Sequence, residues 1–93
     1  MFIKVIRLIE RWSNGEKNYY LHEVSLNTNH IAFLSENVEI KSILMEGKLN
    51  IDLNKKADFT DIKLSSGKEI TVIGSASVIE SKIINSGKKI LRG

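Results

Sequence analysis

The Asn14–Gly15 dipeptide constrains the fold of this chain more than any other feature of its sequence. Both central residues of a type I′ turn need a positive φ angle, which asparagine and glycine adopt at low cost. The dipeptide separates two stretches rich in apolar residues, at 2–12 and 16–26. We therefore expect these stretches to be the two strands of a β-hairpin with a two-residue loop.

The two-residue loop also predicts which residues of the hairpin face each other. The predicted pairs are Leu8 with Leu21, Ile9 with Tyr20, Arg7 with His22, and Val5 with Val24. One face then carries Ile3, Val5, Ile9, Tyr20 and Val24, and the other carries Phe2, Ile6, Leu8 and Leu21. A half-exposed strand alternates apolar and polar residues, so two apolar faces indicate a hairpin that is covered on both sides or meets another subunit.

A second hairpin is predicted around Gly67. A two-residue loop at 66–67 would mix apolar and charged residues on one face, whereas a three-residue loop at 65–67 separates them. The three-residue loop pairs Ile62 with Ile70, Thr60 with Val72, and Lys63 with Glu69, the last as an outward ion pair. Gly67 then takes the left-handed position that closes a bulged turn.

The middle of the chain is expected to form further strands. One strand lies around residues 30–34, a second at 38–45 and a third at 48–57, where apolar and polar residues alternate. Gly47 separates the last two strands. We expect Phe33, Leu34 and Met45 to fill the core.

A C-terminal helix is predicted at 76–86. Its N-terminus is capped either by Ser75 or by Ser77, which has Glu80 three residues later as in a capping box. Gly87 is the expected stop. The apolar side is lined by Ala76, Ile79, Ile83 and Ile84.

These elements define an α+β fold class that is mostly β. The expected architecture is a small antiparallel sheet or partly open barrel of about six short strands with one C-terminal helix. With 93 residues, the chain should form one domain at 1–87, followed by a basic tail at 88–93.

Composition and the first residues indicate where the protein acts. The chain has no cysteine, which excludes disulfides and thiolate metal sites and fits a reducing cytoplasm. Lys4 and Arg7 interrupt the apolar N-terminal stretch, which therefore does not resemble a signal peptide. No apolar run reaches the roughly 20 residues that a membrane helix needs. We expect a cytoplasmic protein without membrane association.

The charge is uneven along the chain. The net charge is +3 at pH 7, which is compatible with nucleic-acid binding. No acidic residue follows Glu80, whereas the basic residues Lys82, Lys88, Lys89 and Arg92 do. The tail is either a solvated basic segment or an arm that contacts phosphates or a partner. Isoleucine, lysine and asparagine supply 33 of the 93 residues, a bias typical of a low-GC genome such as that of a Firmicute or of many phages.

The first hairpin carries the best candidate binding surface. Aromatic and basic residues gather near its tip, namely Arg7, Arg11, Trp12, Lys17, Tyr19 and Tyr20. Such residues could stack bases and bind phosphates, or the aromatic rings could pack across the strands and cap the core. A second candidate set, Arg7, Lys63 and Lys68, could hold a small anionic ligand between subunits.

No stretch matches a catalytic or metal-binding motif. The sequence SGKE at 66–69 lacks the upstream glycine and the Ser/Thr of a phosphate loop. The two histidines, His22 and His30, have no spacing that points to a metal site. We expect no cofactor, no metal and no enzymatic activity.

Several segments together resemble a known family. The segments are IKVIRLIE, LNTNHIAFL, TDIKLSSGKEITV and SASVIESKI. They are similar to the FlbD/SwrD-like small proteins linked to flagella and swarming motility, with matches at Leu26, Asn27, Ile31, Leu64, Gly67, Ile70, Val72, Val78, Ile79 and Ile83. The resemblance covers about half of the chain and implies a small non-enzymatic regulatory or adaptor protein.

Three functional hypotheses follow. The first is a regulatory or adaptor module that self-associates and acts through protein contacts, encoded by a phage and modulating its host. The second is a nucleic-acid-binding regulator that uses the aromatic and basic hairpin and the basic tail. The third is an oligomer that binds a small anionic ligand such as a signalling nucleotide.

Overall fold

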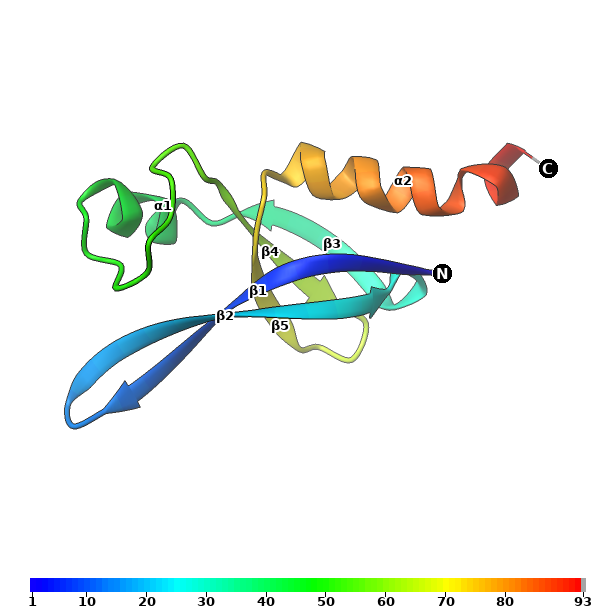
Figure 1. The fold of residues 1–93 in the computed structure, drawn as a ribbon. Coiled ribbons are helices and arrows are strands. Elements are labelled where there is room, and N and C mark those ends of the chain that lie inside the picture. The colour runs from blue at the N-terminus through cyan, green and yellow to red at the C-terminus, as the bar shows by residue number, and fades with distance from the viewer. Residues whose placement is uncertain (93) are drawn as a thin grey trace.

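The computed structural model describes the chain from residue 1 to residue 92, and its side chains from residue 1 to residue 86 (Figure 1). Its elements in order are β1 (Phe2–Ser13), β2 (Glu16–Asn27), the 3₁₀ turn η1 (Thr28–His30), β3 (Ile31–Glu36), α1 (Val38–Met45), β4 (Phe59–Leu64), β5 (Glu69–Ile73) and α2 (Ala76–Arg92). The prediction of a mostly β, antiparallel fold is confirmed. The described chain has five strands rather than about six, and two α-helices rather than one.

The first hairpin forms as predicted. Asn14 and Gly15 have φ angles of 52° and 78°, as a type I′ turn requires. All four predicted residue pairs are present, from Leu8 opposite Leu21 to Val5 opposite Val24. The ladder continues without a bulge from Ser13–Glu16 at the tip to Phe2–Asn27 at the base.

The five strands form one open antiparallel sheet in the order β2-β1-β5-β4-β3. Its two edges, β2 and β3, are consecutive in sequence and are joined by η1. The edges differ, because the pairing of β3 with β4 shifts register at Ala32 while the ladder of β2 is regular. β1 and β5 pair only at Arg7–Val72 and Leu8–Thr71.

The sheet buries a separate cluster on each of its faces. Val5, Ile62 and Val72 lie on the side covered by α2, which we name the α2 face, and pack with Ile79 of that helix. The other side, the α1 face, carries Leu8 and Phe59, which pack with Leu44 of α1. The root of the hairpin therefore buries Val5 on one face and its middle buries Leu8 on the opposite face (Figure 1), whereas Phe2, Ile6 and Leu21 of the α1 face stay exposed.

Residues 38–45 form the helix α1, so the predicted strand is wrong. The side chain of Asn37 caps the helix by accepting a hydrogen bond from the Ile40 N–H at 2.9 Å. Gly47, with φ of 73°, closes the other end, and the Lys48 N–H bonds the Ile43 carbonyl at 3.0 Å. The helix buries Leu44, whereas Met45, expected in the core, is exposed.

Residues 48–57 form a loop, so the second predicted strand is also wrong. The apolar residues of the alternating pattern, Leu49, Ile51 and Leu53, pack on the α1-face cluster without strand pairing. Lys41 of α1 anchors the loop through hydrogen bonds from its Nζ to the carbonyls of Lys55 and Ala57, at 2.9 and 2.6 Å. The alternation of apolar and polar residues in this segment therefore reflects a loop whose apolar side chains pack on the core, not a strand.

The second hairpin has the predicted three-residue loop. Ile62 faces Ile70, Thr60 faces Val72 and Lys63 faces Glu69, and Gly67 has a φ of 95°. The predicted ion pair is not formed. The ion pairs of the described side chains join Lys17 to Glu10, Lys41 to Asp58, and Lys48 to Glu46.

The helix α2 begins where expected and ends later. Ser75 is its cap, since its Oγ accepts from the Val78 N–H at 3.2 Å. Gly87 does not stop the helix, which continues to Arg92, because a helix interior tolerates glycine at about 1 kcal/mol relative to alanine. Ile79 is 1 % exposed, whereas Ile84, also expected on the apolar side, is exposed. None of the described helices is both long and apolar enough to cross a lipid bilayer.

Candidate functional site

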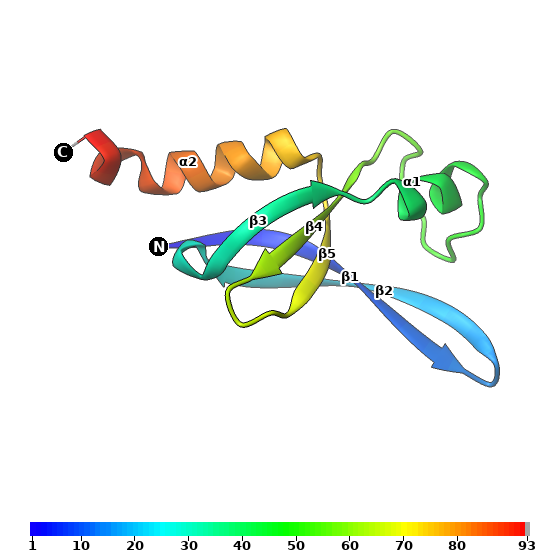
Figure 2. The same cartoon turned by 180° about the vertical axis from the view of Figure 1, so that it is seen from behind.

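The outer half of the β1–β2 hairpin projects from the body of the protein. β1 is bonded to β5 only at Arg7 and Leu8, so the strands beyond them pair only with each other. Both views show this part of the hairpin extending past α1, on the side opposite to the C-terminal end of α2 (Figures 1 and 2). The α2 face of the projecting hairpin is therefore not covered by α2.

The hairpin register separates the predicted binding residues into two sets. Trp12, Lys17 and Tyr19 lie on the α1 face. Trp12 and Glu10 are on the same side of β1 as Leu8, and they pair with Lys17 and Tyr19. Arg7, Arg11 and Tyr20 lie on the α2 face. The structure thus does not bring the aromatic residues together on one surface as predicted.

Tyr19 is part of the core rather than of a binding surface. It is 6 % exposed and packs in the cluster of Leu8 and Leu44. Its backbone N–H donates a hydrogen bond to Oδ1 of Asn50, at 3.0 Å. The alternative interpretation from sequence, that an aromatic ring of the hairpin caps the core, is therefore correct for this tyrosine.

The α1 face of the hairpin tip carries an exposed tryptophan whose neighbours already pair with each other. Trp12 is 67 % exposed, and the Lys17 Nζ lies 5.2 Å from the centre of its ring. The same Nζ lies 3.3 Å from the Glu10 carboxylate. The lysine charge is therefore already compensated within the protein.

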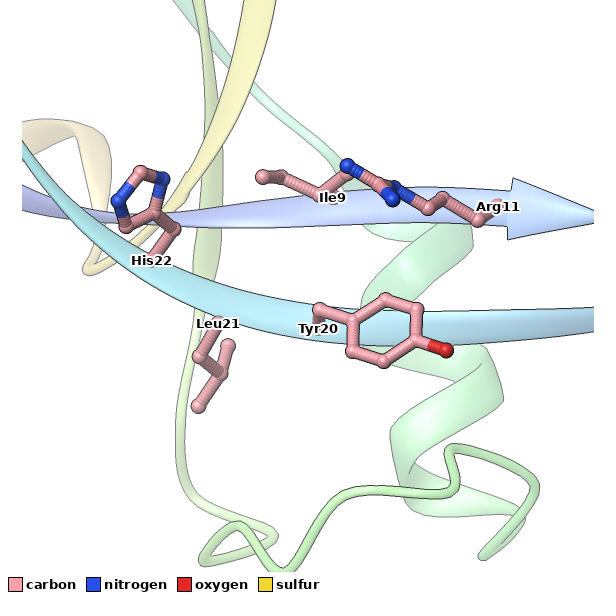
Figure 3. Close-up of a pocket in the computed structure, with 5 residues that line it drawn as sticks. All are labelled: Ile9, Arg11, Tyr20, Leu21 and His22. Atoms are coloured by element: carbon pink, nitrogen blue, oxygen red, sulfur yellow. The ribbon is translucent and has the colours of Figure 1, made fainter.

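The α2 face of the hairpin forms a hollow of about 270 Å³. Its lining comprises Ile9, Arg11, Tyr20, Leu21 and His22. The side chains of Ile9, Arg11 and His22 lie on one side of the ribbon, while Leu21 points to the other (Figure 3). The Arg11 guanidinium carbon lies 5.9 Å from the centre of the Tyr20 ring, which is 50 % exposed.

Three residues of this hollow, Ile9, Leu21 and His22, were not among the predicted binding residues, and His22 is the polar one of the three. The sequence prediction considered it only as a metal ligand, although the predicted pairing with Arg7 already placed it on the face of Tyr20. Residues two apart on a strand share a face, so the register was the signal that could have found it.

Arg7 lies on the same face of β1 as Arg11, nearer to the body of the protein. Its Nε is buried and has no hydrogen-bond partner among the described residues. Within the described side chains, no ion pair involves Arg7 or Arg11. The cations of this face are thus uncompensated, in contrast to Lys17.

The edge of β2 is a second distinctive feature of the hairpin. The hydrogen bond from the Tyr19 N–H to Asn50 shows that this amide points outward from β1. Because amide directions alternate along a strand, Leu21, Glu23 and Ser25 also direct their N–H and C=O groups outward. This stretch presents an open row of backbone donors and acceptors.

The structure does not bring the remaining predicted residues to the hairpin. Lys63 lies on β4, on the opposite face of the sheet from Arg7, and Lys68 follows the turn at Gly67. The side chains of Lys88, Lys89 and Arg92 lie outside the part that the structure describes. Among the residues described, no three His, Asp or Glu side chains gather as metal ligands would.

Comparisons with known proteins return no relative of this chain. No family model, no curated protein and no solved structure matches it. The resemblance to FlbD/SwrD-like proteins therefore stays a hypothesis, and function has to be argued from the surface of the molecule.

Proposed function

We propose that this protein is a non-enzymatic binding module that self-associates by pairing the β2 edges of two copies. The observation that carries the proposal is the unbroken ladder of β2, whose outer backbone groups are open at Leu21, Glu23 and Ser25. Two such edges can pair antiparallel and extend the sheet across both copies.

The contrast between the two edges of the sheet supports this assignment. Proteins protect exposed edge strands with short length, bulges, proline or a covering segment. β3 has 6 residues and an irregular register at Ala32, whereas β2 has 12 residues and a regular ladder. Asn50 covers β2 at Tyr19 only. The β2 edge is therefore the one left free for pairing.

Exposed apolar side chains lie beside this edge. Phe2, Ile6 and Leu21 lie on the α1 face of the hairpin root and are exposed. A second β2 strand would lie next to Leu21 and would remove part of this surface from water, at about 25 cal/mol per Å² of apolar area. Backbone pairing and apolar burial thus favour the same contact.

The module would act through protein contacts as an adaptor or regulator. The FlbD/SwrD-like resemblance implies the same class, and a phage-encoded member of this class would modulate its host. Phe33, predicted in the core, is instead 55 % exposed on β3. It lies at the opposite edge of the sheet from β2, which leaves it accessible to a different protein after self-association.

Self-association can be tested by substituting proline for a residue of β2 whose backbone N–H points outward. Glu23→Pro removes a donor from the β2 edge without removing a bond to β1, so we expect it to convert the oligomer to a monomer. Glu23→Ala is the matched control, because it keeps the amide and should keep the oligomer. Size-exclusion chromatography with light scattering measures the mass, and far-ultraviolet circular dichroism checks the fold.

Two results would contradict the proposal. A monomeric mass for the natural sequence at high concentration would exclude self-association. An oligomer that persists in a folded Glu23→Pro variant would place the contact on another surface.

A further inference from the structure

We infer that the hollow on the α2 face of the hairpin binds single-stranded nucleic acid, with a base stacked on Tyr20 and phosphates contacted by Arg11 and Arg7. The side chains that would contact the nucleic acid, Tyr20, Arg11 and Arg7, lie on the α2 face, whereas self-association uses the outward backbone groups of β2. Leu21 is the one residue that the hollow and the β2 edge share. The inference therefore goes beyond self-association and can be tested independently of it.

The chemistry of the hollow matches an unpaired base. The half-exposed ring of Tyr20 offers a flat apolar surface beside Ile9, in a hollow bounded by Arg11 and His22 (Figure 3). Bases of any sequence stack on aromatic rings, and arginine adds a cation–π contribution. The other exposed aromatic residue near the hairpin tip, Trp12, is flanked by a lysine that forms an ion pair with Glu10.

The charge of this face favours phosphate. Arg7, Arg11 and His22 share the face, while Glu10 and Glu23 of the same two strands lie on the opposite face. Glu16 is the one acidic residue of this face on the hairpin, and it lies at the tip, opposite Ser13. Since the two arginines form no described ion pair, a phosphate does not have to displace a protein carboxylate.

The shape of the hollow favours a strand over a free nucleotide. Pockets for small ligands have volumes of roughly 300–1,000 Å³ and enclose most of the ligand. This hollow of about 270 Å³ lies on a two-stranded ribbon, with four of its five lining residues on the α2 face, and so covers one side of a ligand. Arg7 and Arg11 are four residues apart on β1, or about 13 Å, so a single phosphate is not expected to contact both.

The first experiment measures binding of fluorescein-labelled dT15 by fluorescence anisotropy. We expect Tyr20→Ala to weaken binding about 5- to 100-fold, the range for loss of one stacked base, and Tyr20→Phe to retain it. Arg11→Gln should reduce the slope of log K against log salt by about 0.7, as expected for one phosphate contact on a single strand.

Matched controls come from the opposite face of the same hairpin. Trp12→Ala and Lys17→Gln remove an aromatic ring and a cation of the same tip, and we expect neither to change affinity by more than about twofold. Glu23→Pro should also keep the affinity of each copy for dT15, which separates this surface from the β2 edge. Circular dichroism confirms that each variant is folded.

Each remaining outcome overturns the inference. Absence of dT15 binding at low salt, or an effect of Trp12→Ala equal to that of Tyr20→Ala, would exclude the hollow as the site. Binding of free thymidine nucleotides as tight as that of dT15 would show a small-ligand site instead. Equal binding of a blunt duplex would show that base stacking on Tyr20 is not used.

Discussion

Gly74 illustrates how much of this structure depends on single residues. It joins β5 to α2 with a φ of 124°, and a Cβ atom at this position would lie 3.3 Å from Cδ1 of the buried Ile79. Backbone strain of this kind costs about 1–3 kcal/mol. Both the backbone conformation and the packing against Ile79 therefore favour glycine over any residue with a Cβ atom at this position.

We expect Gly74→Ala to destabilise the protein by about 2–4 kcal/mol, because the displacement of Ile79 adds to the backbone strain. Gly47→Ala is the matched control. Gly47 also has a positive φ, of 73°, but nothing lies within 4 Å of its added Cβ. We expect it to cost about 1–2 kcal/mol. Urea denaturation measures both, and equal losses would show that Ile79 adjusts without cost.

The face on which a site residue lies could be predicted from the sequence wherever the strand register determines it. The register from Asn14–Gly15 places Tyr20 beside Ile9 and predicts the α2 face of the hairpin correctly. Grouping Tyr19 with Tyr20 ignored that adjacent residues of a strand point to opposite faces. The burial of Tyr19 also depends on Leu44 of α1, an element that the sequence patterns assigned to a strand.

At the scale of elements, α1 shows why a local pattern can mislead. Val38 and Ile40 alternate with Glu39 and Lys41, which resembles a strand, but Ile40, Ile43 and Leu44 also have helical spacing. The deciding interaction is the cap, in which Asn37 accepts from the Ile40 N–H. Asn37 also donates to Asp61 of β4, at 3.0 Å, which no sequence pattern shows.

The two roles of Asn37 can be separated by substitution. Asn37→Ala removes both the cap and the bond to Asp61, and we expect a loss of about 1–3 kcal/mol in unfolding free energy. Asn37→Ser keeps a capping oxygen but loses the amide donor, so it should lose less. Thermal or urea unfolding measures the difference, and equal stability of the two variants would mean that the cap contributes nothing.

At the scale of the whole molecule, the sheet consists of two blocks with a narrow junction. The ladder of the β1–β2 hairpin is continuous, and the β3–β4–β5 meander is paired along its strands with one register shift at Ala32. They meet only at Arg7–Val72 and Leu8–Thr71. Side chains on both faces, among them Val5 and Leu8, supply the rest of the attachment.

This division predicts a pattern of amide hydrogen exchange. Amides at the centre of the second hairpin, such as that of Ile62, should be among the slowest to exchange, because they are bonded within a buried block. Amides of the projecting tip, near Trp12, should exchange fastest among the strands. Exchange measured by mass spectrometry or NMR tests this order, and uniform protection along β1 would contradict it.

The narrow junction also has a consequence for the order in which the chain folds. Each hairpin brings together residues close in sequence and can form within about 1–10 μs. The junction instead brings Arg7 to Val72, and closing a loop of that length costs about 3–4 kcal/mol of chain entropy. Two hairpins should therefore form independently, and their encounter should set the folding rate.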